Sequence, residues 1–307
     1  MATKETKKST SEFFSYMQSR IARLHRRGRF GTCQNYERAY RSLRRFYGDK
    51  PLSFRDLDED LVADYEHHLR LRGVKRNSIS FYMRVLRAVY KSAVAEGYAK
   101  EPHPFGHVFT GTEKTRKRAV DIAAIKELKA LDLSMEPSLA YVRDLFLLSL
   151  YLRGMTFVDL AYIRKRDLSN GILDYHRHKS DARLTIKIEP CMQEIIDRYK
   201  NTNNKTPYLL NILKSNDEEK AYLQYQNALT YYNRQLKSLN ALLGNSVGLS
   251  SYTVRHTWAS VAHGSCIPIA LISEGMGHSS EKVTQIYIAS LEASLIDQAN
   301  SEILKLF

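Results

Sequence analysis

Four short segments in the second half of the chain carry side chains suited to chemistry on a phosphodiester. They are LYLRGMTFVDL at 150–160, HRHKSDARL at 176–184, YTVRHTWAS at 252–260 and GMGHSSEKVTQIYIA at 275–289. Attack on phosphorus concentrates negative charge on the non-bridging oxygens. A guanidinium fork can hold those oxygens with paired donors and stays charged at any workable pH. Arg255 is the candidate for one fork, and Arg153 is the candidate for a second.

Three further side chains in these segments could form a bond or move a proton. Tyr287 is the candidate nucleophile, and it needs nearby cations because a phenol normally titrates near ~10. Lys179, near the turn of a predicted hairpin, could protonate a departing oxygen. His278 could donate to the phosphate oxygens or help to move the tyrosine proton. A covalent phosphotyrosine link would conserve the bond energy, which fits the absence of the nucleotide motifs GxxxxGK[ST] and GxGxxG.

The order of these segments resembles the tyrosine recombinase, or phage-integrase, family. An arginine is followed by a hairpin lysine, by Arg255-His256-Thr257, by Gly277-His278 and by a tyrosine nine residues after that histidine. The sequence looks most like the recombinases of Bacteroides-type bacteria. The resemblance implies a mainly α fold with a small β-sheet, in which an N-terminal four-helix SAM-like core-binding domain precedes a mixed α+β catalytic domain. It also implies cleavage through a 3′-phosphotyrosyl intermediate and a Holliday junction.

Two positions depart from the family pattern. Tyr252 stands where the family usually has the histidine of HxxR; its hydroxyl can donate to a phosphate oxygen but cannot act as a base near neutral pH. Thr156 stands where the family has its first arginine, three residues before Asp159. Arg153 lies three residues earlier still, and on a helix it would share that face and reach the same phosphate. The alternative is that Arg153 caps the helix or pairs with an acid such as Asp159.

Neighbouring residues in these segments are expected to support the site rather than to react. We expect His256 to contribute a hydrogen bond and Trp258 to pack in the core. Asp159 would stabilise a helix or orient an arginine.

The charge of the chain is concentrated at one end. The 307 residues suggest two domains at ~150 residues each. Of 47 basic and 33 acidic residues, 26 and 13 fall in residues 1–118, so nearly all of the net charge of +14 lies there. Such an excess predicts a polyanion partner, most often nucleic acid, although a charge that serves solubility is the alternative.

The first ~110 residues show apolar side chains at helical spacing in four stretches, Ser11–Arg29, Gln34–Tyr47, Leu57–Arg72 and Asn77–Ala95. We predict a helical DNA-binding domain over 1–100, a basic linker over 101–118 that lets the two domains clamp a duplex, and a catalytic domain over 119–307. The residues expected to contact DNA are Lys75, Arg76, Arg84, Arg87, Lys91, Lys114, Arg116, Lys117 and Arg118.

The second domain is predicted to be mostly helical. A turn at Ser169-Asn170-Gly171 precedes two paired strands, Ile172–His176 and Ala182–Ile188. A helix over Ser280–Ile288 would carry Tyr287, and a last helix is expected at Leu291–Leu304. The resemblance implies that this last helix docks into a neighbouring protomer and links four subunits on two DNA sites.

Several classes of protein are excluded. No apolar run approaches the ~18–20 residues of a membrane span, and the N-terminus lacks the apolar core of a secretory signal. Cys33, Cys191 and Cys266 are too few and too far apart for a disulfide framework or a thiolate zinc site, and His176 and His178 have no third ligand nearby. We therefore predict a cytoplasmic, nucleoid-associated protein with no metal, no cofactor and no membrane partner.

The predicted function is site-specific recombination. We expect double-stranded DNA with inverted-repeat core sites as the substrate, a homotetramer on two sites, and a monomer or a weak assembly when free. The lead before the first helix is too short for an extra arm-site domain, which favours a DNA invertase for phase variation or a compact mobile-element integrase. The alternatives are a Xer-like resolvase, a type IB topoisomerase and a non-catalytic DNA-binding relative.

Overall fold

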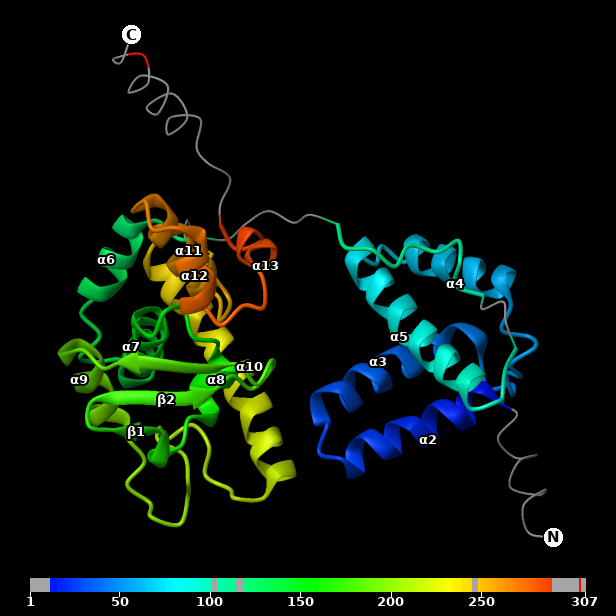
Figure 1. Cartoon of the computed structure of the whole chain (residues 1–307), viewed down its shortest axis with the longest axis horizontal. Helices are drawn as coiled ribbons and strands as arrows, with labels where there is room; N and C mark the ends of the chain where they lie inside the picture. The colour runs from blue at the N-terminus through cyan, green and yellow to red at the C-terminus, as the bar shows by residue number, and fades with distance from the viewer. Residues whose placement is uncertain (1–11, 101–103, 114–118, 245–247, 289–303, 305–307) are drawn as a thin grey trace. The chain divides into compact units, whose positions relative to one another are not determined.

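A computed structural model gives the structure of residues 12–100, 104–113, 119–244, 248–288 and 304 (Figure 1). The chain forms two units, Met1–Thr115 and Arg116–Phe307. It is mainly helical with one small sheet, which confirms the predicted fold class. Among the described residues, no helix combines the length and the apolar character needed to cross a membrane.

The described part of the first unit contains four helices. They are α2 (Phe13–Arg26), α3 (Phe30–Tyr47), α4 (Glu59–Leu71) and α5 (Arg76–Ala95). Their apolar faces meet in a core that includes Phe13, Met17, Leu43 and Leu86, each at most 1% exposed. Side chains cap two of the helices: Asp58 accepts from the Leu61 amide at 2.8 Å and Glu12 accepts from the Ser15 amide at 3.2 Å. The predicted four-helix unit is therefore present, with ends within a few residues.

Part of the segment that was expected to be a linker packs on this unit. Phe105 and Val108 are buried in its core. Asn77 on α5 pairs with the backbone of Glu113, accepting from its amide at 2.7 Å and donating to its carbonyl at 3.0 Å. The segment is held because its two apolar side chains cover core surface that the helices leave open. Residues 101–103 and 114–118 lie outside the described residues.

The second unit is arranged around helix α7 (Pro137–Tyr151), which packs against α9 (Pro190–Tyr199), α10 (Glu218–Leu242) and α11 (Thr253–Gly264). Its buried residues include Val142, Leu145, Phe146 and Leu148. The other elements of this unit are α6 (Ile122–Ala130), α8 (Phe157–Tyr162), η1 (Lys165–Asp167), α9 (Pro190–Tyr199), α10 (Glu218–Leu242), α11 (Thr253–Gly264), α12 (Ile269–Gly275) and α13 (Glu281–Gln285).

An antiparallel sheet of order β1-β2-β3 holds the predicted hairpin. Its strands are Leu168–Ser169, Ile172–His176 and Arg183–Lys187. Asn170 and Gly171 join β1 to β2 with positive φ values of 51° and 72°, as a two-residue hairpin loop requires. Leu173 and Tyr175 face inward on β2, and the tip of the β2–β3 hairpin carries Lys179.

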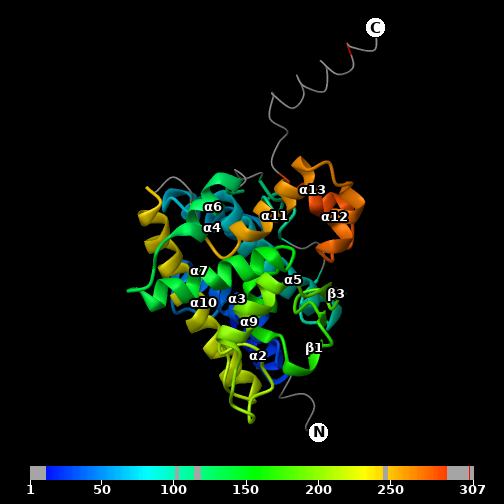
Figure 2. The same cartoon turned by 90° about the vertical axis from the view of Figure 1, so that its left-hand side faces the viewer.

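Helices α11, α12 and α13 gather at one end of the second unit (Figure 2). Ala259, Ala262, Ile272, Met276 and Ile288 form a small core between them, and Trp258 packs against it. The predicted helix over 280–288 is shorter than expected and ends at Gln285, so Tyr287 lies in the turn that follows. The predicted last helix falls outside the described residues, apart from Leu304.

Shortening a side chain at the centre of the second unit should lower its stability. Leu148 is fully buried in α7, so Leu148→Ala should cost about 2–5 kcal/mol of unfolding free energy through lost burial and a residual cavity. Urea unfolding followed by the fluorescence of Trp258, the single tryptophan, reports on this unit. Leu242→Ala, at a residue that is 56% exposed, is the control and should change stability by about 0.5 kcal/mol or less. Equal losses in the two variants would contradict this packing.

Candidate active site

A cavity of about 410 Å³ in the second unit brings together most of the side chains that the sequence singled out. It is bordered by the start of α8, the β2–β3 hairpin, α10, the residues before α11 and the segment from α12 to α13. Its lining includes Thr156, Arg177, Lys179, Tyr225, Tyr252, His278 and Tyr287.

Arg255 is buried on α11 and contacts His278 and Tyr287, which both line the cavity. Its guanidinium donates to the carbonyls of Gly154 at 3.0 Å and Met276 at 2.5 Å, and to Nε2 of His278 at 2.9 Å. Gly154 has φ +66°, and a Cβ there would lie 3.0 Å from the Arg255 Cα, so this close approach needs glycine. Burial, followed by the charge of Arg177, lowers the pKa of Arg255, although a guanidinium remains charged at any working pH.

The hydrogen bonds of His278 identify its tautomer. Because a guanidinium only donates, Nε2 of His278 must accept from Arg255, so the ring proton is on Nδ1. Nδ1 donates to Oγ1 of Thr284 at 2.8 Å. Burial, together with Arg255 and Arg177, lowers the pKa of His278 to about 4. His278 is therefore a neutral hydrogen-bond acceptor toward the cationic side of the site.

Tyr287 is held by rings and by a cation. Its ring stacks on His278 at 5.0 Å between centroids and 24° between planes, and it lies 5.0 Å from the His256 ring. The guanidinium carbon of Arg255 lies 5.6 Å from the Tyr287 ring centroid. His256 Nδ1 also donates to the Tyr287 carbonyl at 3.2 Å, so His256 supports the site as expected. The Tyr287 hydroxyl makes a 2.5 Å hydrogen bond with the hydroxyl of Tyr252.

Arg177 is a cavity residue that the sequence analysis missed. It follows β2 and is only 8% exposed. Its Nη1 donates to the Gly277 carbonyl at 2.9 Å, and its Nε lies 3.6 Å from Oδ2 of Asp159. Gly277 has φ +62°, and a Cβ there would come within 2.9 Å of the Arg177 side chain. The missed signal was the strand alternation, because Arg177 continues the inward-facing row of Leu173 and Tyr175.

Asp159 connects Arg177 to the start of α8. Its Oδ2 accepts from the Thr156 hydroxyl at 2.7 Å, and its Oδ1 accepts from the His178 amide at 2.8 Å. Thr156 itself is the N-cap of α8. Asp159 therefore orients an arginine, as one of the sequence readings proposed, and that arginine is Arg177.

The buried part of the site carries an excess of positive charge. Arg177 and Arg255 are both buried, and Asp159 is the buried carboxylate that pairs with Arg177. The Nε atoms of both arginines are buried without a hydrogen-bond partner among the described residues. Unpaired buried donors on charged groups are costly, so this arrangement suits a bound anion such as a phosphate.

The residues predicted to contact DNA from the first unit lie along α5. Lys75, Arg76, Arg84 and Lys91 are exposed. Arg87 is half-buried and donates to Thr110 at 3.1 Å. The guanidinium of Arg76 lies 4.2 Å above the Phe109 ring. The other residues of that set, Lys114 and Arg116 to Arg118, lie outside the described residues.

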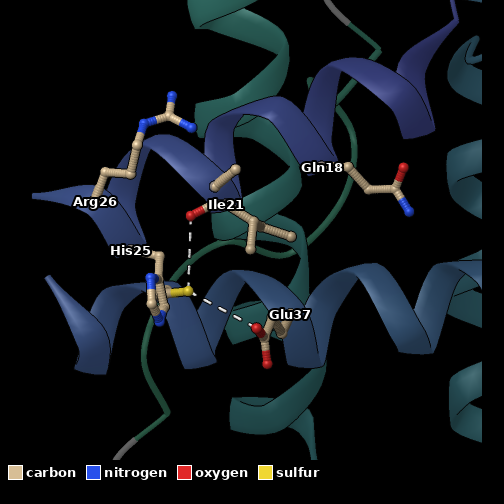
Figure 3. Close-up of a pocket in the computed structure, with 7 residues that line it drawn as sticks. Gln18, Ile21, His25, Arg26 and Glu37 are labelled. Carbon is tan, nitrogen blue, oxygen red and sulfur yellow. Dashed lines mark hydrogen bonds between the residues drawn. The ribbon is translucent and has the colours of Figure 1, made fainter. Parts of the chain in front are cut away.

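A separate cavity of about 400 Å³ lies between α2 and α3 of the first unit (Figure 3). Cys33 is buried there. Its Sγ lies 3.7 Å from the Ile21 carbonyl oxygen and 3.8 Å from Oε1 of Glu37, and these two acceptors share its single proton. Burial, followed by Glu37, raises the pKa of this thiol, so it is not an activated nucleophile. None of the residues predicted from the sequence to act in catalysis or DNA binding lines this cavity.

Comparisons with known proteins show which fold the chain has. Residues 12–108 match the phage integrase SAM-like domain family. The Tn1549 transposon integrase in complex with a circular intermediate DNA is 15% identical, with a TM-score of 0.68 over 96% of this chain and 100% of that one. A lambda integrase dimer bound to a COC′ core site is 19% identical, with a TM-score of 0.62 over 89% of this chain and 76% of that one. A lambda integrase tetramer bound to a Holliday junction is 16% identical, with a TM-score of 0.63 over the same shares. No curated protein matches the chain by sequence.

The chain has the tyrosine recombinase fold. Its first unit contains the SAM-like domain that the sequence predicted, and the second adds the helices and the small sheet.

Within this tyrosine recombinase fold, Arg153 does not line the cavity that Tyr287 lines. Helix α7 ends at Tyr151, and Arg153 has φ +59° in the turn before α8, so it is not on a helix and the expected shared face does not exist. Arg153 lines an adjoining cavity of about 640 Å³ together with His278 and Glu274. The structure thus brings Lys179, Tyr252, His278 and Tyr287 into one cavity with Arg255 against them, whereas Arg153 borders the next one.

The burial and hydrogen bonds of His278 predict the pH at which its ring is protonated in the DNA-free protein. Because its pKa is lowered to about 4, His278 should stay neutral from pH 8 down to pH 5. The unfolded state takes up this proton near ~6.5, so the contribution of His278 to stability should fall as the pH drops from that value toward 4. NMR of the histidine ring protons, assigned with His278→Gln, measures this directly. A midpoint near the ordinary histidine value would contradict the assigned hydrogen bonds.

Proposed function

We propose that this protein is a site-specific DNA recombinase that cleaves and rejoins DNA through a 3′-phosphotyrosyl intermediate on Tyr287. The observation that carries the proposal is a cavity lined by Tyr287 and Arg177, with Arg255 against the Tyr287 ring. Both guanidiniums are buried, and their Nε atoms lack a hydrogen-bond partner within the described part of the chain. The likeness to integrases bound to DNA, and to one tetramer bound to a Holliday junction, supports it.

In the proposed step, the Tyr287 oxygen attacks the scissile phosphorus and forms the P–O(Tyr) bond while the bond from phosphorus to the 5′ oxygen breaks. The proton of the half-exposed Tyr287 passes to solvent, because both ring nitrogens of His278 are already hydrogen-bonded, to Arg255 and to Thr284. Lys179, exposed at the hairpin tip and lining the same cavity, gives a proton to the departing 5′ oxygen. Rejoining reverses these steps: the 5′ hydroxyl of a second strand attacks the phosphotyrosine and releases Tyr287, and no ATP is needed.

Arg177 and Arg255 are proposed to hold the two non-bridging oxygens. Both guanidiniums are fixed by backbone carbonyls before DNA binds, so little reorganisation is needed as charge develops. Thr156 occupies the sequence position of the family's first arginine, and its bond to Asp159 helps to orient Arg177 instead. The phosphate contact predicted for Arg153 stays a prediction. The adjoining cavity that Arg153 lines is a separate observation.

The partner in this proposal is double-stranded DNA with inverted-repeat core sites, encountered on the nucleoid in the cytoplasm. The exposed cations along α5 would contact phosphates, so binding should weaken steeply with salt. We also propose a homotetramer on two sites, which the likeness to a lambda integrase tetramer bound to a Holliday junction supports. That the last segment of the chain links its subunits stays a prediction from the resemblance.

Within this function, we propose a DNA invertase or a compact mobile-element integrase of the Bacteroides type. Sequencing the DNA that flanks the gene in many cells would find inverted repeats in both orientations if the protein inverts DNA. Relaxation of plasmids that lack a target site would instead indicate a type IB topoisomerase.

Removing the nucleophile should abolish covalent capture of DNA. Incubation of the protein with fragments of its source genome, followed by denaturation, should yield a DNA adduct whose sequence identifies the site. Tyr287→Phe should give no adduct while duplex binding persists, because the ring remains and only the attacking oxygen is lost. An undiminished adduct in this variant would overturn the proposed nucleophile.

Arg177 should be needed for rapid cleavage. On a nicked duplex built from the captured sequence, Arg177→Ala should slow adduct formation by about 10²–10³-fold with DNA binding retained. Arg177→Lys, which keeps a charge opposite Asp159 but loses the fork, should also be slow and guards against a folding defect. Arg166→Ala, at an exposed arginine of η1, is the control. Normal cleavage by both Arg177 variants would contradict the clamp.

A further inference from the structure

Tyr252 makes a contact that its position in the HxxR motif does not predict. Its hydroxyl lies 2.5 Å from the Tyr287 hydroxyl, and the two rings lie 5.9 Å apart between centroids. The Tyr252 ring also meets His256 edge-on at 5.5 Å. The residue that replaces the family histidine is therefore bonded to the proposed nucleophile itself.

The direction of this hydrogen bond is fixed once Tyr287 loses its proton. Either hydroxyl can donate while both are neutral. A phenolate oxygen only accepts, so Tyr252 must donate to Tyr287 after ionisation. Hydrogen bonds to an ionised oxygen are roughly twice as strong as neutral ones, so the bond strengthens as the nucleophile forms.

The cationic and aromatic groups of the site lie mainly against the ring of Tyr287. Arg255 lies against the Tyr287 ring, Arg177 and Lys179 reach the cavity from the hairpin, and His256 and His278 face the same ring; Asp159 is paired with Arg177. Burial, followed by the bond to Tyr287, raises the pKa of Tyr252. Tyr252 is therefore suited to keep its proton and to donate it in this hydrogen bond.

We propose that Tyr252 positions and activates the nucleophile by donating a hydrogen bond to the Tyr287 oxygen, holding that oxygen in the phosphate cavity before and during attack. The inference rests on the proposed function of Tyr287. In this step Tyr252 forms and breaks no covalent bond; the Tyr287 proton leaves, the oxygen attacks phosphorus, and the Tyr252 O–H stays intact. Tyr252 thus acts on the nucleophile, whereas the sequence predicted a hydrogen bond from its hydroxyl to a phosphate oxygen.

The test compares the pH dependence of single-turnover cleavage of the nicked duplex by wild-type protein and by Tyr252→Phe. Loss of the donor should slow cleavage about tenfold to a hundredfold at neutral pH. It should also move the alkaline rise of the rate upward by about one to two pH units, because the phenolate is less stable without its donor. Duplex affinity and the melting temperature should stay at wild-type values, since the side chain is partly exposed and loses one atom.

Tyr231→Phe, which removes a hydroxyl from α10 outside the cavity lining, is the matched control and should leave the pH profile unchanged. An unchanged profile in Tyr252→Phe, or DNA covalently attached to Tyr252 in peptide maps, would overturn the inference. Failure of the wild-type protein to attach DNA to Tyr287 would instead overturn the proposed recombinase function, so the two failures are distinguishable.

Discussion

The burial of two arginines beside a single carboxylate is the constraint on which the rest of the site depends. Arg177 and Arg255 would repel each other in an uncompensated interior, and the charge of Arg177 contributes to lowering the pKa of Arg255. Carbonyls of Gly154, Met276 and Gly277 and the carboxylate of Asp159 offset part of this cost. Among the described residues, the Nε donors of both arginines still lack a hydrogen bond, and the proposed function assigns the remaining positive charge to the phosphate.

This constraint explains several local features of the chain. Gly154 and Gly277 both take positive φ and both lie where a Cβ would press on one of the arginines or its backbone. The neutral state of His278 follows from its burial and from the same two guanidiniums, next to which a third cation would be unfavourable. The small core between α11, α12 and α13 then carries Tyr287 to the edge of this cationic cluster.

The sequence predicted the elements well and the site in part. Helical spacing located the four helices in the described part of the first unit, and Asn170-Gly171 located the turn that leads into the strands on either side of Lys179. The motif order found Arg255, His278 and Tyr287, because their relative spacing within α11 to α13 is local. Arg177 was not predicted because the family pattern points to residues near Thr156 in sequence, whereas Arg177 directly follows β2, about twenty residues further on.

Two predictions from the sequence were wrong because local patterns show neither where a helix ends nor which loop residues become buried. The expected helical neighbourhood of Arg153 fails because α7 ends at Tyr151 and the chain turns through a left-handed residue, which periodicity does not reveal. Residues 104–113 were read as linker from their prolines, glycines and charge, yet Phe105 and Val108 bury themselves in the first unit. The contact between Tyr252 and Tyr287 joins residues 35 positions apart and depends on tertiary packing that spacing alone cannot supply.

The central claim is that Arg177 binds the negative charge of the scissile phosphate. Replacing one non-bridging oxygen with a methyl group gives a methylphosphonate, which lacks that charge. Cleavage of the phosphate and methylphosphonate duplexes by wild-type protein and by Arg177→Ala forms a cycle that isolates the interaction of Arg177 with the charge. The account predicts that the penalty of Arg177→Ala largely disappears on the neutral substrate; an equal penalty on both substrates would contradict it.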